Sequence, residues 1–288
     1  MVKLWEKFWF SQASKEVIGF YRFIMFSALT YVLVINYDLE LRNDCQFWNP
    51  EGVYKLLGIT CSESNFNQLY WISTLTAPLA SIGFLYRFTG IISAFSGMLF
   101  LGYNYNLHRF YHSYHLFVVS LIILSIACAA DSFSIDSLIR KVKNKKKFNY
   151  SWPVQLIKVY VVYVYFICGA EKLYIRGLDW VFSDNLFLII FTNPQRGWFS
   201  DWVLSQPLWM SVALAGYSLF VCELLAPLAL LNRRTGLLFW FIWLSFHVGV
   251  QLTLGGHKMF FTQLVTASVF LLPQKLNLKS FKNIVSGT

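Results

Sequence analysis

Charged residues are scarce in this chain of 288 residues. They make up 13% of the sequence, whereas soluble domains carry about 25%. Hydrophobic residues make up 57% and aromatic residues 19%. So few charged side chains cannot cover that much apolar surface in water, which excludes an ordinary soluble domain. The composition indicates an integral membrane protein.

Several chemical motifs are also absent. The five Cys include no C-x-x-C pair, and the sequence has no zinc-ligand spacing, Gly-rich phosphate loop or G-x-S-x-G elbow. We therefore expect no metal site. The N-terminal stretch interleaves Lys with Trp and Phe, and it lacks the continuous apolar run and cleavage site of a removable signal peptide. We expect residues 1–16 to form an amphipathic interfacial helix.

What the sequence does contain is a series of apolar runs. A spanning helix needs about 20 largely apolar residues. Eight segments fit: roughly 17–35, 68–86, 88–106, 113–131, 153–171, 208–231, 236–254 and 258–272. They predict an all-α fold, a polytopic transmembrane helical bundle of about eight spanning helices over residues 17–272. Interfacial helices are expected at the N-terminus and in the outer loops, and a basic cytoplasmic tail at 273–288.

The positive charges lie mostly in short loops between these runs. This placement argues against a nucleic-acid partner, although the net charge is +10, and makes the lipid bilayer the expected partner. Positively charged loops are retained in the cytoplasm. With the N-terminus inside, the inner segments hold fifteen of the 24 Lys and Arg residues, and the outer segments hold seven. We expect a multi-pass cell-membrane protein with both termini in the cytoplasm.

Two of the Cys share the first outer loop, residues 37–67. An oxidising compartment would allow Cys45 and Cys61 to form a disulfide there. The other three Cys fall within apolar runs, where a Cys is most simply a small buried hydrophobic residue.

Ionisable residues within or at the ends of apolar runs are the candidate functional residues. Such groups are costly at membrane depth, so each one is a functional hypothesis. They are Arg22, His112, Lys158, Glu171, Lys172, Glu223, His247 and His257. Structural roles remain open for two of them, because Lys158 can extend to the cytoplasmic face and Arg22 can pair with Glu223.

Four of these residues belong to the outer half of the predicted bundle: His112, Lys172, His247 and His257. We expect them to share a pocket that opens outward. Burial disfavours the ammonium form of lysine, which makes Lys172 a candidate general base, and a neutral His112 could orient or exchange a proton. Walls rich in Tyr, Trp and Phe would suit a flat, apolar ring such as a quinone.

Several segments together resemble the successive signatures of one family, the HTTM domain, which is the transmembrane part of vitamin K-dependent γ-glutamyl carboxylase. They are YRF (21–23), FLYRFTG (84–90), YHSYHLF (111–117), YFICGAEKL (165–173), DW (179–180), CELLAPLALLNRRTG (222–236) and FHVGVQLTLG (246–255). Their order and approximate spacing agree over nearly the whole chain. The resemblance implies a membrane enzyme that acts on a reduced, vitamin K-like quinone.

The resemblance also implies roles for particular residues. Lys172 matches the Lys assigned as the base that initiates oxygenation of the reduced quinone, while Glu171 replaces a Lys of the family motif. His112 matches a His assigned to carbanion or CO₂ handling. Family positions also match His247, Glu223 and Arg22. We therefore expect Lys172, His112 and His247 to be catalytic, with Glu223, Arg22, Glu171 and His257 as a supporting polar pocket.

Two departures keep other functions open. The carboxylase continues into a lumenal domain that binds its protein substrate, whereas this sequence ends at Thr288, so we expect a bacterial-type relative without that domain. Glu171 would favour the charged form of Lys172 and weaken it as a base. One alternative is a non-catalytic membrane accessory for maturation or export of a secreted peptide. Another is a quinone carrier or transporter, although no internal repeat is evident.

Overall fold

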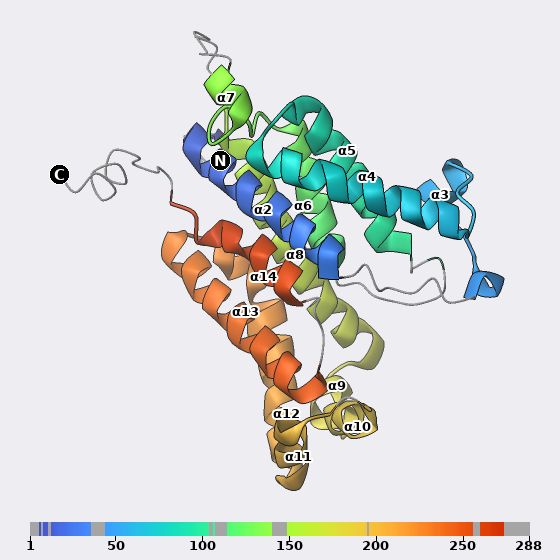
Figure 1. The fold of residues 1–288 in the computed structure, drawn as a ribbon. Coiled ribbons are helices and arrows are strands. Elements are labelled where there is room, and N and C mark those ends of the chain that lie inside the picture. Colours follow the sequence, from blue (N-terminus) through green and yellow to red (C-terminus); the bar gives the residue numbers. More distant parts are fainter. Residues whose placement is uncertain are drawn as a thin grey trace. The chain divides into compact units, whose positions relative to one another are not determined.

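The computed structural model describes residues 6, 8–10, 13–35, 44–103, 106, 114–139, 149–194, 196–255 and 260–273. Within these ranges every regular element is a helix and no strand is present, which confirms the all-α prediction. The chain forms two compact units, which are described separately. Unit 1 comprises Met1–Leu156 and Leu272–Thr288, and unit 2 comprises Ile157–Leu271. Figure 1 shows their helices.

Unit 1 is built on four longer helices with short helices between them. Its elements are α2 (Lys15–Ile35), η1 (Asp44–Phe47), α3 (Val53–Leu56), α4 (Glu63–Ile82), α5 (Tyr86–Gly102), α6 (His115–Ile126) and α7 (Ile135–Ile139). α4 packs along both α2 and α5, and α6 packs against α5 and α2. The core of the unit lies between these helices.

The turn between α4 and α5 is set by two residues of unit 1. Gly83 ends α4 with φ 66°, a left-handed conformation that favours glycine. Asp136, from α7, then accepts hydrogen bonds from the first backbone amides of the next helix, those of Leu85 and Tyr86, both at 2.9 Å. These amides would otherwise lack partners at the helix start. The turn is therefore held by a carboxylate distant in sequence.

Unit 2 contains most of α8 (Ser151–Arg176), which begins in unit 1, and the helices that follow it. These are α9 (Asp179–Phe182), α10 (Asn185–Thr192), α11 (Trp198–Ser205), α12 (Leu208–Gly216), η4 (Tyr217–Leu224), η5 (Ala226–Leu230), α13 (Arg233–Leu254), α14 (Phe260–Ala267) and η6 (Ser268–Phe270). α13 packs against η4, η5, α11 and α14, while α12 packs against α9, α10 and α11.

The predicted helix over 208–231 is not regular. It runs as α-helix to Gly216, as the π-helix η4 to Leu224, and as the 3₁₀-helix η5 after that. Pro227, at the start of η5, has no backbone N–H to continue the α-helical pattern. The next helix starts cleanly, because the Asn232 side chain accepts hydrogen bonds from the first amides of α13.

Each of the eight apolar runs contains a helix, but fewer helices are long and apolar enough to cross a bilayer. Three qualify among the described residues: α2, α8 and α13. A fourth span exists if α11 and Leu208–Leu224, which meet at an angle of 114°, count as one. α6 has 12 residues, and α4 begins with polar residues. The fold is that of an α-helical membrane protein with three or four spans by this measure.

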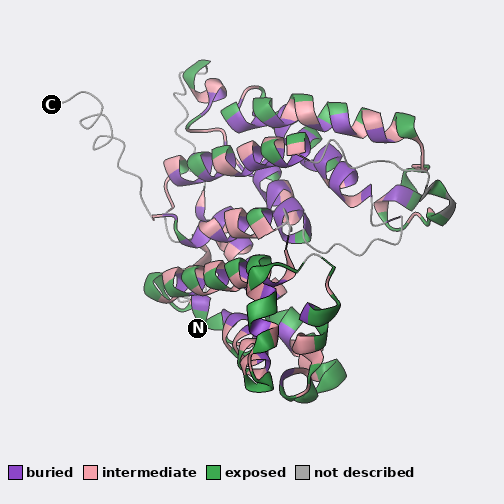
Figure 2. Cartoon of the chain, turned by 60° about the horizontal axis from the view of Figure 1, so that its bottom comes forward, coloured by how far each residue is buried: buried purple, intermediate pink, exposed green. Residues whose placement is uncertain are grey.

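Burial differs between the spanning helices, and Figure 2 colours each described residue by its burial. In the most apolar window of α2, 56% of the residues are buried, against 39% for α8 and 17% for α13. α13 therefore presents long apolar side chains outward, including Leu238 and Phe241. A helix that is apolar on its outer face suits contact with lipid.

Candidate functional site

An ion pair joins α8 to η4 in unit 2. Lys172 Nζ donates a hydrogen bond to Oε1 of Glu223 at 2.5 Å. The Lys172 side chain is 27% exposed and the Glu223 side chain 6%. Removing one partner of a buried pair leaves an uncompensated charge, at a cost of about 3–5 kcal/mol. Each group of this sheltered pair therefore depends on the other.

A glycine allows the two helices to approach at this point. A Cβ atom built on Gly169 would lie 2.8 Å from the Cβ of Glu223, closer than real Cβ contacts. Gly169 precedes Lys172 by three residues, so the two share a face of α8. Glu223 itself lies in a π-helix, a rare element that is frequent at functional sites. The close approach of the two helices at Gly169 and the π-helical turn of η4 together bring the Glu223 carboxylate to Lys172.

An indole ring covers the ammonium group. Lys172 Nζ lies 4.4 Å from the ring centroid of Trp180, which belongs to α9. Trp180 also packs against the buried cluster of Val181, Ala215 and Leu219. A cation over an indole face is stabilised by about 0.5–2 kcal/mol, depending on exposure. The Lys172 ammonium is thus held by a carboxylate and an aromatic ring from different elements.

A second polar contact lies further back along α8. The Tyr165 hydroxyl and Nε2 of His247 are 2.6 Å apart. The Tyr165 ring stacks on Trp243, with centroids 4.5 Å apart and planes at 10°. Trp243 donates from Nε1 to the carbonyl of Cys222 at 3.0 Å. The phenol, imidazole and indole groups therefore form one buried cluster between α8, α13 and η4.

The Lys172–Glu223 and Tyr165–His247 contacts lie along the same face of α8 in unit 2. Tyr165 and Lys172 are seven residues apart, which is two helical turns or about 10 Å along one face of α8. On η4, Glu223 directly follows Cys222, whose carbonyl accepts the bond from Trp243. The chain thus connects the ion pair to the Tyr165–His247 contact through adjacent residues.

Two buried polar atoms of these two contacts have no hydrogen-bond partner in the described part of the chain. They are Oε2 of Glu223 and Nδ1 of His247. Buried polar atoms are nearly always satisfied by protein, water or a ligand. A hydroxyl or amide group from a bound molecule could satisfy either atom. The carboxylate and the imidazole are both groups that can exchange protons.

The acid next to Lys172 in sequence is not its partner in space. Glu171 is exposed, because successive residues on a helix point about 100° apart. The carboxylate in contact with Lys172 is Glu223. Lys158, nearer the start of α8, instead lies with Nζ 5.7 Å from the ring centroid of Phe270.

Arg22 lies in unit 1 with partners of its own. It is fully buried, its Nη2 donates to the carbonyl of Phe133, and its guanidinium lies 5.4 Å from the ring centroid of Tyr86. The cation that pairs with Glu223 is Lys172.

Two of the expected site residues, His112 and His257, lie outside the described residues.

The structure joins Cys45 to Cys61 by a disulfide. Of the Cys within apolar runs, Cys222 is buried whereas Cys168 is exposed, so burial is the wrong description for Cys168.

Two cavities lie in unit 1. One, of about 440 Å³, lies between α2 and α7 and is lined by Phe20 and Phe133. The other, of about 690 Å³, is lined by Tyr54 and His115. Neither is lined by Lys172. Among the described residues, no group of three or more His, Cys, Asp and Glu is placed to hold a metal ion.

Three site residues were not among the expected site residues: Tyr165, Trp180 and Trp243, of which the first two lie in segments that carry the family resemblance. Aromatic residues are abundant in this chain, and most of them pack helices, so residue type alone does not distinguish these three. The spacing along the helices does point to two of them. Tyr165 precedes Lys172 by seven residues, and Trp243 precedes His247 by four, so each shares a helix face with a flagged residue.

Comparisons with known proteins gave one match. The family model described as the HTTM domain matches residues 11–274, nearly the whole chain. No curated protein and no solved structure matches the chain.

Proposed function

The chain belongs to the HTTM domain family, and on this premise we propose that unit 2 is a proton-transfer site within the membrane, with Lys172 as the base. The proposed substrate is a reduced quinone or a similar lipophilic molecule with an acidic hydroxyl group. One observation carries the proposal. It is the sheltered ion pair of Lys172 with Glu223, whose other carboxylate oxygen is buried and has no partner in the part of the chain that the structure describes.

Lys172 must first lose a proton, because a protonated amine is not a base. The hydrogen bond of 2.5 Å to Glu223 provides the path. Transfer of one proton from Nζ to the carboxylate leaves a neutral amine and a neutral acid, which avoids the cost of keeping two charges in an apolar site. Glu223 thus activates Lys172 in this proposal.

The neutral amine then removes the proton of the substrate hydroxyl. The O–H bond breaks, its electron pair stays on the substrate oxygen, and a new N–H bond forms on Lys172. The resulting anion lies beside the ammonium, which stabilises the charge that develops. The half-buried ring of Trp180 provides apolar surface for an aromatic substrate. Oxygenation of the anion would need O₂ as co-reactant.

A reduced naphthoquinone is a suitable probe for this activity. We expect the purified protein in phospholipid vesicles to accelerate O₂ uptake from the reduced probe. The paired substitution Lys172→Met with Glu223→Gln should return the rate to background. This pair removes both charges together, so no unpaired charge is left buried. Wild-type protein that binds the probe and gives only the background rate would contradict the base assignment.

A carrier of lipophilic molecules is the second candidate. Transporter sites are often built from discontinuous helices, and the 208–231 segment is broken into α12, η4 and η5. A carrier would move oxidised naphthoquinone between vesicles without O₂ uptake.

A non-catalytic accessory that matures or exports a secreted peptide would neither move the naphthoquinone nor accelerate O₂ uptake. Such a peptide co-purifying with the protein would indicate this function.

We also propose that both termini lie in the cytoplasm, as the distribution of Lys and Arg indicates. In intact cells, a thiol reagent that does not cross membranes should label a Cys introduced at position 60 and should miss one at position 145. Labelling of position 145 from outside would reverse the orientation.

A further inference from the structure

The short helix α11 presents two tryptophans on its outward face. Trp198 and Trp202 are four residues apart, so they share that face, and their exposed fractions are 74% and 45%. Ser200 and Val203, on the other side of the helix, are buried. Exposed aromatic residues at this density are unusual on a surface that contacts only water.

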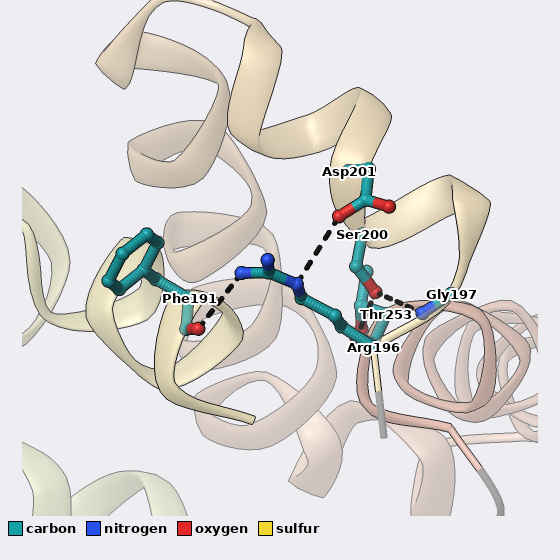
Figure 3. A network of polar contacts seen from close by, with 6 residues as sticks. All are labelled: Phe191, Arg196, Gly197, Ser200, Asp201 and Thr253. Atoms are coloured by element: carbon teal, nitrogen blue, oxygen red, sulfur yellow. Dashed lines mark hydrogen bonds and ion pairs between the residues drawn. The ribbon is translucent and has the colours of Figure 1, made fainter. Parts of the chain in front are cut away.

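The charge on this face is neutralised. Asp201 is the only ionisable residue of α11, and its Oδ1 pairs with Arg196 Nε at 3.4 Å. The same guanidinium donates to the carbonyl of Phe191 at 3.2 Å. Figure 3 shows Arg196 lying between Phe191 and Asp201. The face therefore combines indole rings with a balanced ion pair and carries no net charge.

The buried side of α11 is fixed to the end of a spanning helix. Ser200 donates to the carbonyl of Thr253, in the last turn of α13, as Figure 3 also shows. Asn193, just before α11, donates to the carbonyl of Leu254 at 2.6 Å. Because α13 is long and apolar enough to cross a bilayer, its last residues mark the boundary between hydrocarbon and water. α11 is thereby held at that boundary.

The geometry excludes α11 as part of a straight span. It has 8 residues, or about 12 Å of helix, against a hydrocarbon thickness of about 30 Å. Its axis also meets that of the following helix, Leu208–Leu224, at 114°. A helix that leaves a span at this angle and is tied to the end of another runs along the membrane surface.

We propose that the Trp198 and Trp202 face of α11 is a lipid-binding surface, inserted among the phospholipid headgroups of the leaflet in which α13 ends. Indole rings favour this depth, because the ring is apolar while its N–H can bond to phosphate or ester oxygens. The surface also concerns the candidate site, because α10 contacts α11 and α9, and Trp180 of α9 covers Lys172. The lipid surface itself does not depend on the proposed proton transfer.

Spin-label accessibility tests this proposal without an activity assay. The free cysteines Cys128, Cys168 and Cys222 are replaced by Ser, and a single nitroxide is attached at W198C or W202C. Arg234→Cys, at the opposite end of α13, is the matched control because that side chain is exposed in a polar helix start. The protein is studied in phosphatidylcholine vesicles by collision with O₂, which partitions into lipid, and with a water-soluble nickel chelate.

We expect the labels at 198 and 202 to be several-fold more accessible to O₂ than to the nickel chelate, and the control to show the reverse. Preferential access of the chelate to both tryptophan positions would overturn the proposal. Low access of both reagents would also overturn it, because a protein surface would then cover the face. If the labelled variants fail to fold, Trp198→Phe with Trp202→Phe should lose part of the tryptophan emission that shallow brominated lipids quench in the wild type. Unchanged quenching would contradict the lipid surface.

Discussion

The two units hold their buried cations in different ways. In unit 1, Arg22 is enclosed completely, donates from Nη2 to a backbone carbonyl and lies over an aromatic ring, while its Nε and Nη1 have no hydrogen-bond partner among the described residues. In unit 2, Lys172 is partly exposed and pairs with a carboxylate whose second oxygen has no hydrogen-bond partner within the described ranges. The spanning helices also differ in burial, since α2 of unit 1 is much more buried than α13 of unit 2.

This difference separates a supporting role from a functional one. A cation that is fully enclosed by its own unit has no route to a substrate, so Arg22 serves to hold α2 against the turn before α5. A cation with 27% of its side chain exposed can meet a ligand. We therefore expect substitutions in unit 1 to act on stability and those around Lys172 to act on function.

The largest stability effect is expected at Gly83 of unit 1. An added Cβ there would collide with Arg22 Nη1 and with Ser134 Cβ, and the residue has φ 66°. Strain of both kinds should make Gly83→Ala destabilising by roughly 3 kcal/mol or more, measured as a lower thermal midpoint in detergent. Gly58→Ala is the control, because Gly58 also has positive φ but has nothing near its Cβ position. Equal losses at the two sites would show that enclosure of Arg22 is unimportant.

The disulfide should contribute the next largest effect in unit 1. Cys45 and Cys61 close a loop with a sequence separation of 16, worth about 3 kcal/mol in the chain-entropy model. The paired substitution Cys45→Ala with Cys61→Ala should lower the thermal midpoint, and reductant should then have no further effect. Cys128→Ser serves as the control for loss of a thiol. A free-thiol assay that labels Cys45 and Cys61 in the unreduced protein would contradict the bond.

Gly169→Ala extends the comparison to unit 2. The added methyl group would meet the Glu223 side chain, so we expect about 1–3 kcal/mol of destabilisation from overpacking. Unlike Gly83→Ala, it should also reduce O₂ uptake from the reduced naphthoquinone, because it separates Glu223 from Lys172. Gly249→Ala, on α13 with open space around its Cβ position, should change neither quantity. Loss of stability with full activity would place the ion pair outside the functional site.

The smallest stability effect is expected for Tyr165→Phe. It removes one hydrogen bond to His247 and keeps the stack on Trp243, a loss of about 1 kcal/mol. His247 would then have both ring nitrogens without a described partner, so binding of the naphthoquinone should weaken more than folding does. Fluorescence titration of the protein with the probe measures this change. Unaltered binding would show that the Tyr165–His247 contact only supports the helices.

The sequence allowed the positions of the helices and the individual charged residues to be predicted. Lys172, Glu223 and His247 were flagged because ionisable residues are costly within apolar runs, and all three lie in one unit. The Lys172–Glu223 contact could not be predicted, since it depends on how α8 and η4 approach each other at Gly169. Glu171, the neighbour in sequence, was the more obvious acid and is exposed.

The sequence pattern also did not predict that the helix over 208–231 is irregular. The apolar run over 208–231 satisfies the length of a span, but hydrophobicity does not report the change from α- to π- and 3₁₀-helix. The π-helical turn places Glu223 at Lys172, so the least regular part of the run carries the group of most interest.

The most direct test of the account is the comparison of Lys172→Arg with Lys158→Arg. An arginine at 172 keeps a positive charge for Glu223, so the ion pair and the thermal midpoint should be preserved, but guanidinium is not deprotonated in proteins. We predict that Lys172→Arg reduces O₂ uptake from the reduced naphthoquinone to background, while Lys158→Arg, on the same helix and without a carboxylate partner in the described chain, keeps the wild-type rate. Wild-type uptake by folded Lys172→Arg protein would contradict the assignment of Lys172 as the base.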